Sequence, residues 1–223
     1  MSTRTVITSG PVRDRPRVFQ VARAALLIVA LFSTLSALSQ GVTVAMGSLF
    51  AFGGADGRLP LVRLPQLIQA DLREGAEGTL AEADLGLRLL GALPSFLQAA
   101  TIVLATVFLL RVLRGIAAGR AFDPFVLENW RRLSLALLIG GVVQGLADTA
   151  ANVYLTSHVG LLFWSGQVTD AQRERFLGGD YQAIGTNLPQ WPLPVLMAGV
   201  LALALGAAFR AGAKLERDVD GVV

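Results

Sequence analysis

Polar side chains recur at regular intervals in one apolar stretch of the sequence. Gln144, Asp148 and Asn152 are four residues apart, so an α-helix places them on one face. An acid within a membrane-spanning helix is energetically costly and is therefore a candidate functional group. Gln40 and Gln98 lie in two further apolar stretches and reach about the same depth. These five residues predict an intramembrane polar layer.

Two interpretations of this layer are open. It can bind a small solute or a proton, as in a transporter or channel. It can also hold the helices together through hydrogen bonds worth roughly 0.6–2 kcal/mol each. In either case Asp148 is expected to face the interior near Gln40 or Gln98, with Arg88 as an alternative counter-ion.

The other residue types argue against catalysis. The chain has no cysteine and one histidine, His158, which excludes the common thiolate and multi-histidine zinc sites. It has no Ser/His/Asp spacing, HExxH motif or glycine-rich nucleotide turn. We therefore predict a protein that is not an enzyme and has no catalytic residue, metal or cofactor. Apolar stretches separate the basic residues, so nucleic acid is not an expected partner.

The elements that position these residues are long and apolar. Of the 223 residues, 53% are hydrophobic and only 16% are charged, and the mean hydropathy of +0.59 exceeds that of ordinary soluble domains. Each apolar stretch is long enough to cross a hydrocarbon core of about 30 Å. We predict an all-α membrane protein, a four-helix bundle with spans at about 24–46, 89–110, 133–155 and 192–209.

The first span has an alternative interpretation as a signal peptide, because basic residues precede it. Its 23 residues exceed the 7–15 residues of a signal-peptide core. We therefore expect an uncleaved helix, a disordered arm at 1–17, a single membrane domain at 18–213 and a short tail at 214–223.

The distribution of charge predicts the orientation. Thirteen of the 19 arginines and lysines fall in the two terminal segments and the connection between the second and third spans. Basic residues accumulate on the cytoplasmic side, which predicts a multi-pass protein of the bacterial plasma membrane with both termini in the cytoplasm.

Two external loops then follow, at 51–87 and 156–190. In the first, Leu64, Leu67, Ile68 and Leu72 have helical spacing and predict a short amphipathic helix, with a loop docked on the bundle as the alternative. In the second, Thr169 and Gln172 form a capping-box pattern for a helix through Phe176. Neither loop is large or apolar enough to suggest a core of its own.

Small residues mark the packing faces of the last two spans. Gly141 and Gly145 form a Gly-x-x-x-Gly pair, and Ala198, Ala202 and Gly206 form a stripe. Both patterns permit close helix approach. Packing within one chain is the first interpretation, and a homodimer is the alternative.

The connection between the second and third spans has the residues of a tight turn. Gly119 is suited to closing one helix, while Asp123 and Pro124 are suited to the N-cap and first position of the next. The connection also contains candidate partner-binding residues, because arginine and aromatic side chains are enriched at interaction hot spots. Anchoring of these side chains among lipid headgroups is the alternative. The residues are Arg120, Phe122, Phe125 and Trp130.

This connection carries a family resemblance. Residues 114–123 (RGIAAGRAFD) and 128–133 (ENWRRL), with 209–218 (FRAGAKLERD) near the C-terminus, are similar to segments of the DUF2975 family of bacterial integral membrane proteins. Ala121 stands where that family usually has proline. The resemblance implies four membrane helices, a charged helical tail and no established activity. Members are often encoded beside small helix-turn-helix regulators, which implies a regulatory association.

These observations predict a non-catalytic accessory or signalling protein. It lies in the lipid bilayer and acts through a membrane or cytoplasmic partner. The alternative is a small-solute or proton transporter that uses the polar layer around Asp148.

Overall fold

Four long helices dominate the computed structural model, which describes residues 15–49, 57–120, 122–162 and 166–220. Each is long and apolar enough to cross a membrane, which indicates a multi-pass membrane protein. Residues 1–14, the greater part of the predicted arm, lie outside the described residues. The four helices are α1 (Arg15–Met46), α2 (Leu85–Ala117), α3 (Pro124–His158) and α5 (Leu193–Asp220).

All four helices extend beyond the predicted spans. α1 begins at Arg15, inside the segment assigned to the arm, so the arm is shorter than predicted. α5 continues without a break through 214–220, as the family resemblance implied for the charged tail. The apolar pattern locates the part of a helix suited to lipid, whereas backbone hydrogen bonding continues into the polar flanks.

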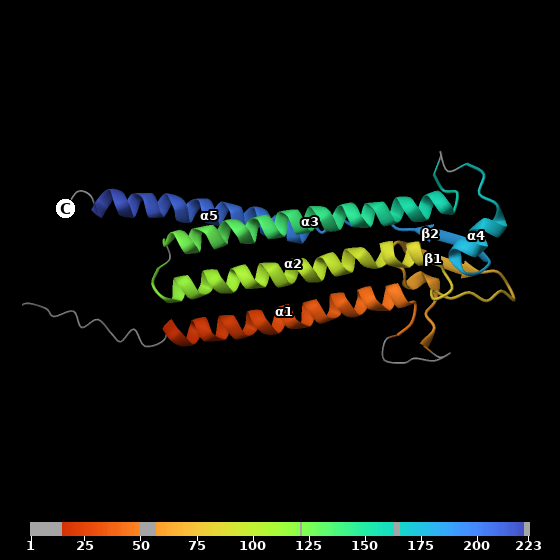
Figure 1. The fold of residues 1–223 in the computed structure, drawn as a ribbon, viewed down its shortest axis with the longest axis horizontal. Helices are drawn as coiled ribbons and strands as arrows, with labels where there is room; N and C mark the ends of the chain where they lie inside the picture. Colours follow the sequence, from red (N-terminus) through yellow and green to blue (C-terminus); the bar gives the residue numbers. More distant parts are fainter. Residues whose placement is uncertain (1–14, 50–56, 121, 163–165, 221–223) are drawn as a thin grey trace, which may run out of the picture.

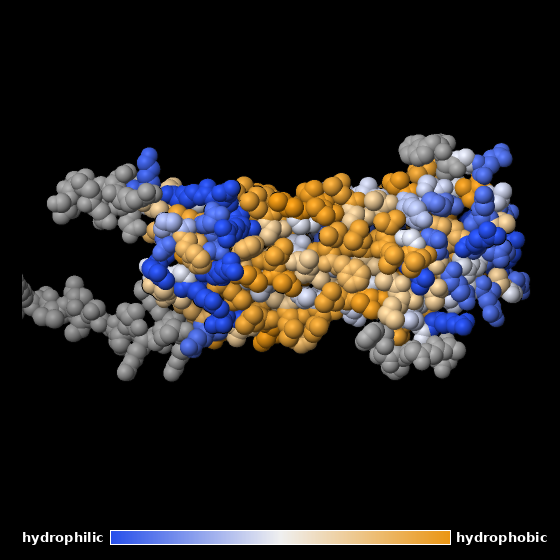
Figure 2. Space-filling model, viewed as in Figure 1, coloured by the Kyte–Doolittle hydropathy of each residue, from blue (hydrophilic) through white to orange (hydrophobic). Residues whose placement is uncertain are grey.

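The long helices form an open row. α1 packs on α2, α2 on α3, and α3 on α5, while the described parts of α1 and α5 make no comparable contact. Figure 1 shows this order, with the first residues of α1 and the last residues of α5 on the same side of the molecule. An apolar belt separates two polar ends in Figure 2. The predicted bundle is therefore a row whose first and last helices are not packed together.

The turn between α2 and α3 has the predicted chemistry. Gly119 has a φ of 73°, a conformation that glycine adopts without steric cost. The Asp123 carboxylate accepts a hydrogen bond of 2.8 Å from the Phe125 amide, and Pro124 occupies the first helical turn. The N-cap prediction is confirmed.

The opposite end of the row carries a compact group of short elements, which we call the headpiece (residues 57–84, 159–162 and 166–192). Its elements are a 3₁₀-helix η2 (Leu61–Arg63), strands β1 (Leu67–Leu72) and β2 (Tyr181–Thr186), and helix α4 (Asp170–Leu177). The two strands pair antiparallel. The prediction of an all-α chain is therefore wrong in the headpiece.

The predicted amphipathic helix at 64–72 is also wrong. Leu67 is buried while Ile68 next to it is 65% exposed, as expected where successive side chains of a strand point to opposite faces. The partner strand lies more than 100 residues further along the chain. A local hydrophobic period cannot reveal such a pairing, because strand formation depends on its tertiary context.

The second headpiece prediction is confirmed. Thr169 and Gln172 form the complete capping box of α4, and the helix ends at Gly178, whose φ of 71° is left-handed.

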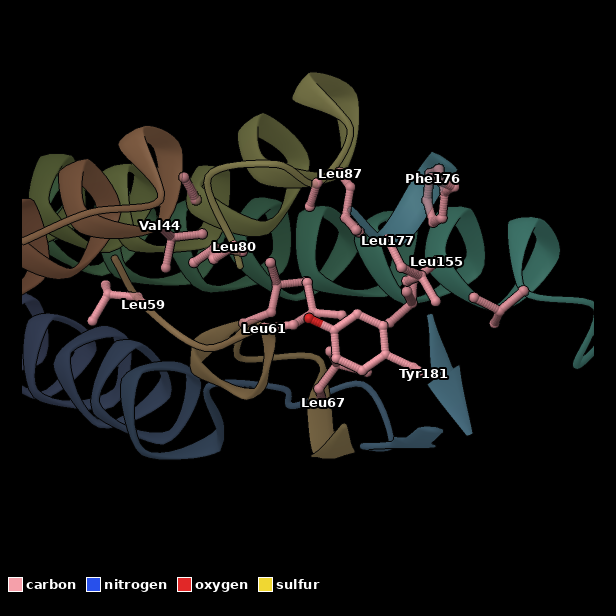
Figure 3. Close-up of a cluster of buried hydrophobic side chains, with 14 residues drawn as sticks. Val44, Leu59, Leu61, Leu67, Leu80, Leu87, Leu155, Phe176, Leu177 and Tyr181 are labelled. Carbon is pink, nitrogen blue, oxygen red and sulfur yellow. The ribbon is translucent and has the colours of Figure 1, made fainter. Parts of the chain in front are cut away.

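The main hydrophobic core lies where the headpiece meets the row (Figure 3). Leu61 and Leu80 from the first loop, Leu177 from α4, and Leu155 from α3 are all almost fully buried. Complete burial of one such side chain contributes roughly 1.5–3 kcal/mol. The loops thus share one core with the helix ends, in keeping with the expectation that neither loop has a core of its own.

Candidate functional site at the base of the headpiece

Asp148 is buried at the junction of α3 and the headpiece, with an exposed fraction of 7%. Three nitrogen atoms donate hydrogen bonds to its carboxylate. They are Gln66 Nε2 at 3.0 Å, the Gln190 backbone amide at 2.6 Å and Asn152 Nδ2 at 3.4 Å. Hydrogen bonds to an ionised group are roughly twice as strong as neutral ones. Asp148 therefore fixes two headpiece segments, one at Gln66 and one at Gln190, to a single point on α3.

The two segments are also joined directly to each other. The Asn187 backbone amide donates to the Gln66 backbone carbonyl oxygen at 2.8 Å, and the Asn187 side-chain Nδ2 donates to the Pro65 carbonyl oxygen at 2.9 Å. Gly91 of α2 leaves room for this arrangement, because a Cβ there would lie 3.1 Å from Gln66 Oε1. The Asp148 site is thus built by α2, α3 and both loops.

The predicted partners of Asp148 are wrong. Arg88 Nη1 donates instead to the carbonyl oxygens of Ala45 and Met46, at 3.4 and 3.2 Å, and so ties α2 to the end of α1. Gln40 and Gln98 do not donate to the carboxylate; they line a separate hollow of about 360 Å³ between α1 and α2. Within the described residues no basic side chain pairs with Asp148.

Gln144 belongs to a further site. With Gln98 it lines a groove of about 530 Å³, and its Oε1 is buried without a hydrogen-bond partner among the described residues. The five polar residues therefore separate into the Asp148–Asn152 pair under the headpiece and the glutamines along hollows between the helices. Within the described residues no hydrogen bond joins the two groups, and the single polar layer stays a prediction.

The groove is lined mostly by apolar side chains of the row. All four long helices contribute to it, including α1 and α5, the first and last helices of the row. Trp130 lies towards the termini end, and Gln98 and Gln144 lie towards the headpiece end. Its remaining walls are mostly aliphatic, among them Ala30, Ala105, Leu133, Leu137, Ala198, Leu201 and Ala202.

The predicted packing glycines contact α5 and the residues before it. A Cβ at Gly141 would lie 2.7 Å from Leu196, one at Gly145 would lie 2.6 Å from the Trp191 ring, and one at Gly206 would lie 3.4 Å from Trp130. Close approach at Gly141 and Gly145 is therefore used within the chain, whereas a Cβ at Gly206 would make an ordinary contact. In the predicted alanine stripe, Ala202 is buried and Ala198 is exposed along the groove.

The aromatic residues near the α2–α3 turn differ in exposure. Phe122 and Trp130 both pack on Phe209 of α5, with ring centroids 6.2 and 5.9 Å apart. Phe125 is 58% exposed. Arg120, also exposed, lies 4.0 Å from the Asp123 carboxylate. Of the predicted partner surface, Phe125 and Arg120 point most clearly away from the row.

Sequence reasoning missed the residues that complete the Asp148 site. Gln66 and the Gln190 amide lie in loops with no local signal, since a single glutamine beside a proline is unremarkable. Trp191 was detectable in part, because an aromatic residue before Pro192 at the start of an apolar stretch is typical of a packed helix entry. No group of three metal-ligating side chains occurs in the part of the chain that the structure describes.

Comparisons of the chain with protein-family models, curated proteins and solved structures find no match, and the resemblance to the DUF2975 family stays a prediction.

Proposed function

We propose that this protein is a non-catalytic component of the bacterial plasma membrane that acts through a protein partner. The carrying observation is that Asp148, the acid expected to bind a solute or proton, already accepts hydrogen bonds from Gln66, Gln190 and Asn152. It holds the headpiece to the helices, and the groove does not include it. This use favours a structural role over transport.

The proposed orientation places both termini in the cytoplasm and the headpiece outside. Support comes from the charges at the two ends of the row. The termini end carries Arg23, Arg111, Arg114, Arg120, Arg131, Arg132, Arg210 and Lys214. The positive-inside rule assigns such an end to the cytoplasm.

The proposed partner surface is the exposed part of the α2–α3 turn. The Phe125 ring and the Arg120 guanidinium are both exposed, and both residues are joined to the Asp123 cap, Arg120 by an ion pair and Phe125 through its backbone amide. Aromatic and arginine side chains are enriched at interaction hot spots, and a fixed backbone lowers the ordering cost of binding. A cytoplasmic protein, or the cytoplasmic face of a membrane protein, would have access to this surface.

Double substitution Phe125→Ala and Arg120→Ala tests the proposal. Because both side chains are largely exposed, we expect a nearly unchanged melting temperature and loss of the proteins that co-purify in mild detergent. A control variant, Arg132→Ala with Leu135→Ala, removes an exposed pair elsewhere on α3 and should retain them. The same partners on both variants would contradict this surface.

A further inference from the structure

A second hollow lies at the termini end, between α1 and α2. It has a volume of about 600 Å³ and is lined by Arg23 on α1 and Arg114 on α2, with apolar side chains such as Phe19 and Leu113 between them. Neither arginine forms an ion pair among the described residues. Two cations face a partly apolar space without an anion.

This basic hollow continues the line of the groove. On α1, Arg23 of the hollow lies one turn from Leu26 of the groove, and on α2, Leu113 lies one turn from Leu109. Side chains three or four residues apart share a helix face. The two spaces therefore follow one track from a basic end to an apolar interior.

Trp130 adds an unpaired donor along this track. Its indole Nε1 is buried with no hydrogen-bond partner among the described residues, although buried tryptophan nitrogens usually find one. The nitrogen reaches a molecule in the groove when the ring turns towards it. Trp130 is six residues into α3, and Arg114 is three residues from the end of α2. Because the two helices are antiparallel neighbours, the indole lies about one turn deeper than Arg114.

The size of the groove decides between two occupants. A membrane-spanning helix about 30 Å long and 10 Å wide occupies on the order of 2,000 Å³, several times the 530 Å³ of the groove. The groove is instead within the roughly 300–1,000 Å³ of small-ligand pockets. A single hydrocarbon chain fits within it, whereas a partner helix would enter it only in part.

We propose that this track binds one anionic glycerophospholipid. Arg23 and Arg114 contact the phosphate, and Trp130 Nε1 donates to an ester carbonyl oxygen one turn deeper. One acyl chain lies in the groove and ends near Gln98 and Gln144. Basic pockets between membrane helices are suited to anionic headgroups, and each basic side chain near a membrane surface contributes about 1 kcal/mol. The site orders the lipid between α1 and the other three helices.

Native mass spectrometry of the delipidated full chain tests the headgroup contacts. Dioleoyl phosphatidylglycerol and dioleoyl phosphatidylcholine, which have the same chains, are titrated separately. We expect phosphatidylglycerol to bind more tightly than phosphatidylcholine, and Arg23→Gln with Arg114→Gln to weaken phosphatidylglycerol roughly 30-fold. Binding of phosphatidylcholine, whose choline offsets the charge of its phosphate, should weaken much less. Trp130→Phe, which keeps the ring, should weaken both lipids several-fold.

A matched charge control lies on the other side of the row. Arg131, Arg210 and Lys214 line a basic hollow between α3 and α5, so Arg131→Gln with Arg210→Gln removes two charges from the same end. This variant should bind phosphatidylglycerol with the affinity of the unmodified protein. If it loses that lipid while the Arg23/Arg114 variant retains it, the proposed site is wrong.

Filling the groove tests the acyl chain. Ala105→Phe should weaken both lipids equally, because it removes space for the chain without changing charge. Ala30→Leu serves the same purpose if the larger side chain prevents folding. Glycerol phosphate at millimolar concentration should not displace the lipid. Displacement of the lipid by glycerol phosphate would show a site for free phosphate. Unchanged lipid binding in a folded groove-filling variant would show that no acyl chain lies in the groove, and either result would overturn the lipid assignment.

Discussion

At the scale of single residues, Asp148 shows how an intramembrane acid can serve structure. Its carboxylate receives hydrogen bonds from three directions, so the cost of burying it is offset without a basic partner. Gln144, one turn away on the same helix, has a buried amide oxygen that accepts no hydrogen bond from a described residue. The two side chains therefore contribute very differently to stability.

Asp148→Asn replaces one accepting oxygen with a donating NH₂ group, which then faces a hydrogen-bond donor. We expect a loss of about 1–3 kcal/mol in the free energy of unfolding, measured by thermal unfolding in detergent. The matched substitution Gln144→Leu should cost little or stabilise the protein. The transport alternative predicts a different result: a proton or solute flux in proteoliposomes that Asp148→Asn abolishes at an unchanged melting temperature.

At the scale of elements, the packing of α3 on α5 depends on glycines that differ in the space around them. A Cβ at Gly145 would meet the Trp191 ring at 2.6 Å, whereas a Cβ at Gly206 would make an ordinary contact with Trp130 at 3.4 Å. Trp191 follows Gln190, whose amide binds Asp148. Displacement of Trp191 thus also affects the attachment of the headpiece.

The same substitution at both glycines separates these effects. Gly145→Ala should destabilise the protein by about 1–3 kcal/mol, because overpacking forces the indole and its backbone to move. Gly206→Ala should be neutral or stabilise it by up to about 1 kcal/mol, through the higher helix propensity of alanine. Differential scanning calorimetry in detergent measures both. Equal effects of the two changes would show that Trp191 repacks freely.

The elements differ in how far the sequence could predict them. The four long helices, the Asp123–Pro124 helix start and the Thr169–Gln172 capping box were predictable, because their signals are local or repeat with the helical period. The pairing of β1 with β2, and the meeting of Gln66 with Asp148 across 82 positions, depend on contacts that no local pattern encodes. Asp148 was grouped with Gln40 and Gln98 only because the three residues reach a similar depth in the membrane. That criterion did not reveal that Asp148 bonds to the headpiece.

At the scale of the whole molecule, the headpiece and the termini lie at opposite ends of an apolar belt. The two ends differ in what fixes them. The headpiece shares a hydrophobic core with the neighbouring helix ends. The termini end is basic and contains two hollows lined by arginine side chains. A membrane with anionic lipid on its cytoplasmic surface would attract the basic end, which leads to the proposed orientation.

Single cysteines test that orientation without background, since the native chain has none. Ala118→Cys lies in the exposed α2–α3 turn, and Glu74→Cys lies in the exposed turn after β1. In intact cells an impermeant maleimide should label position 74 and spare position 118, because only the headpiece is accessible from outside. After lysis both should react, which confirms that position 118 is chemically competent. Labelling at 118 with protection at 74 would show the opposite orientation in the membrane. The Arg23–Arg114 lipid site would then lie on the outer side.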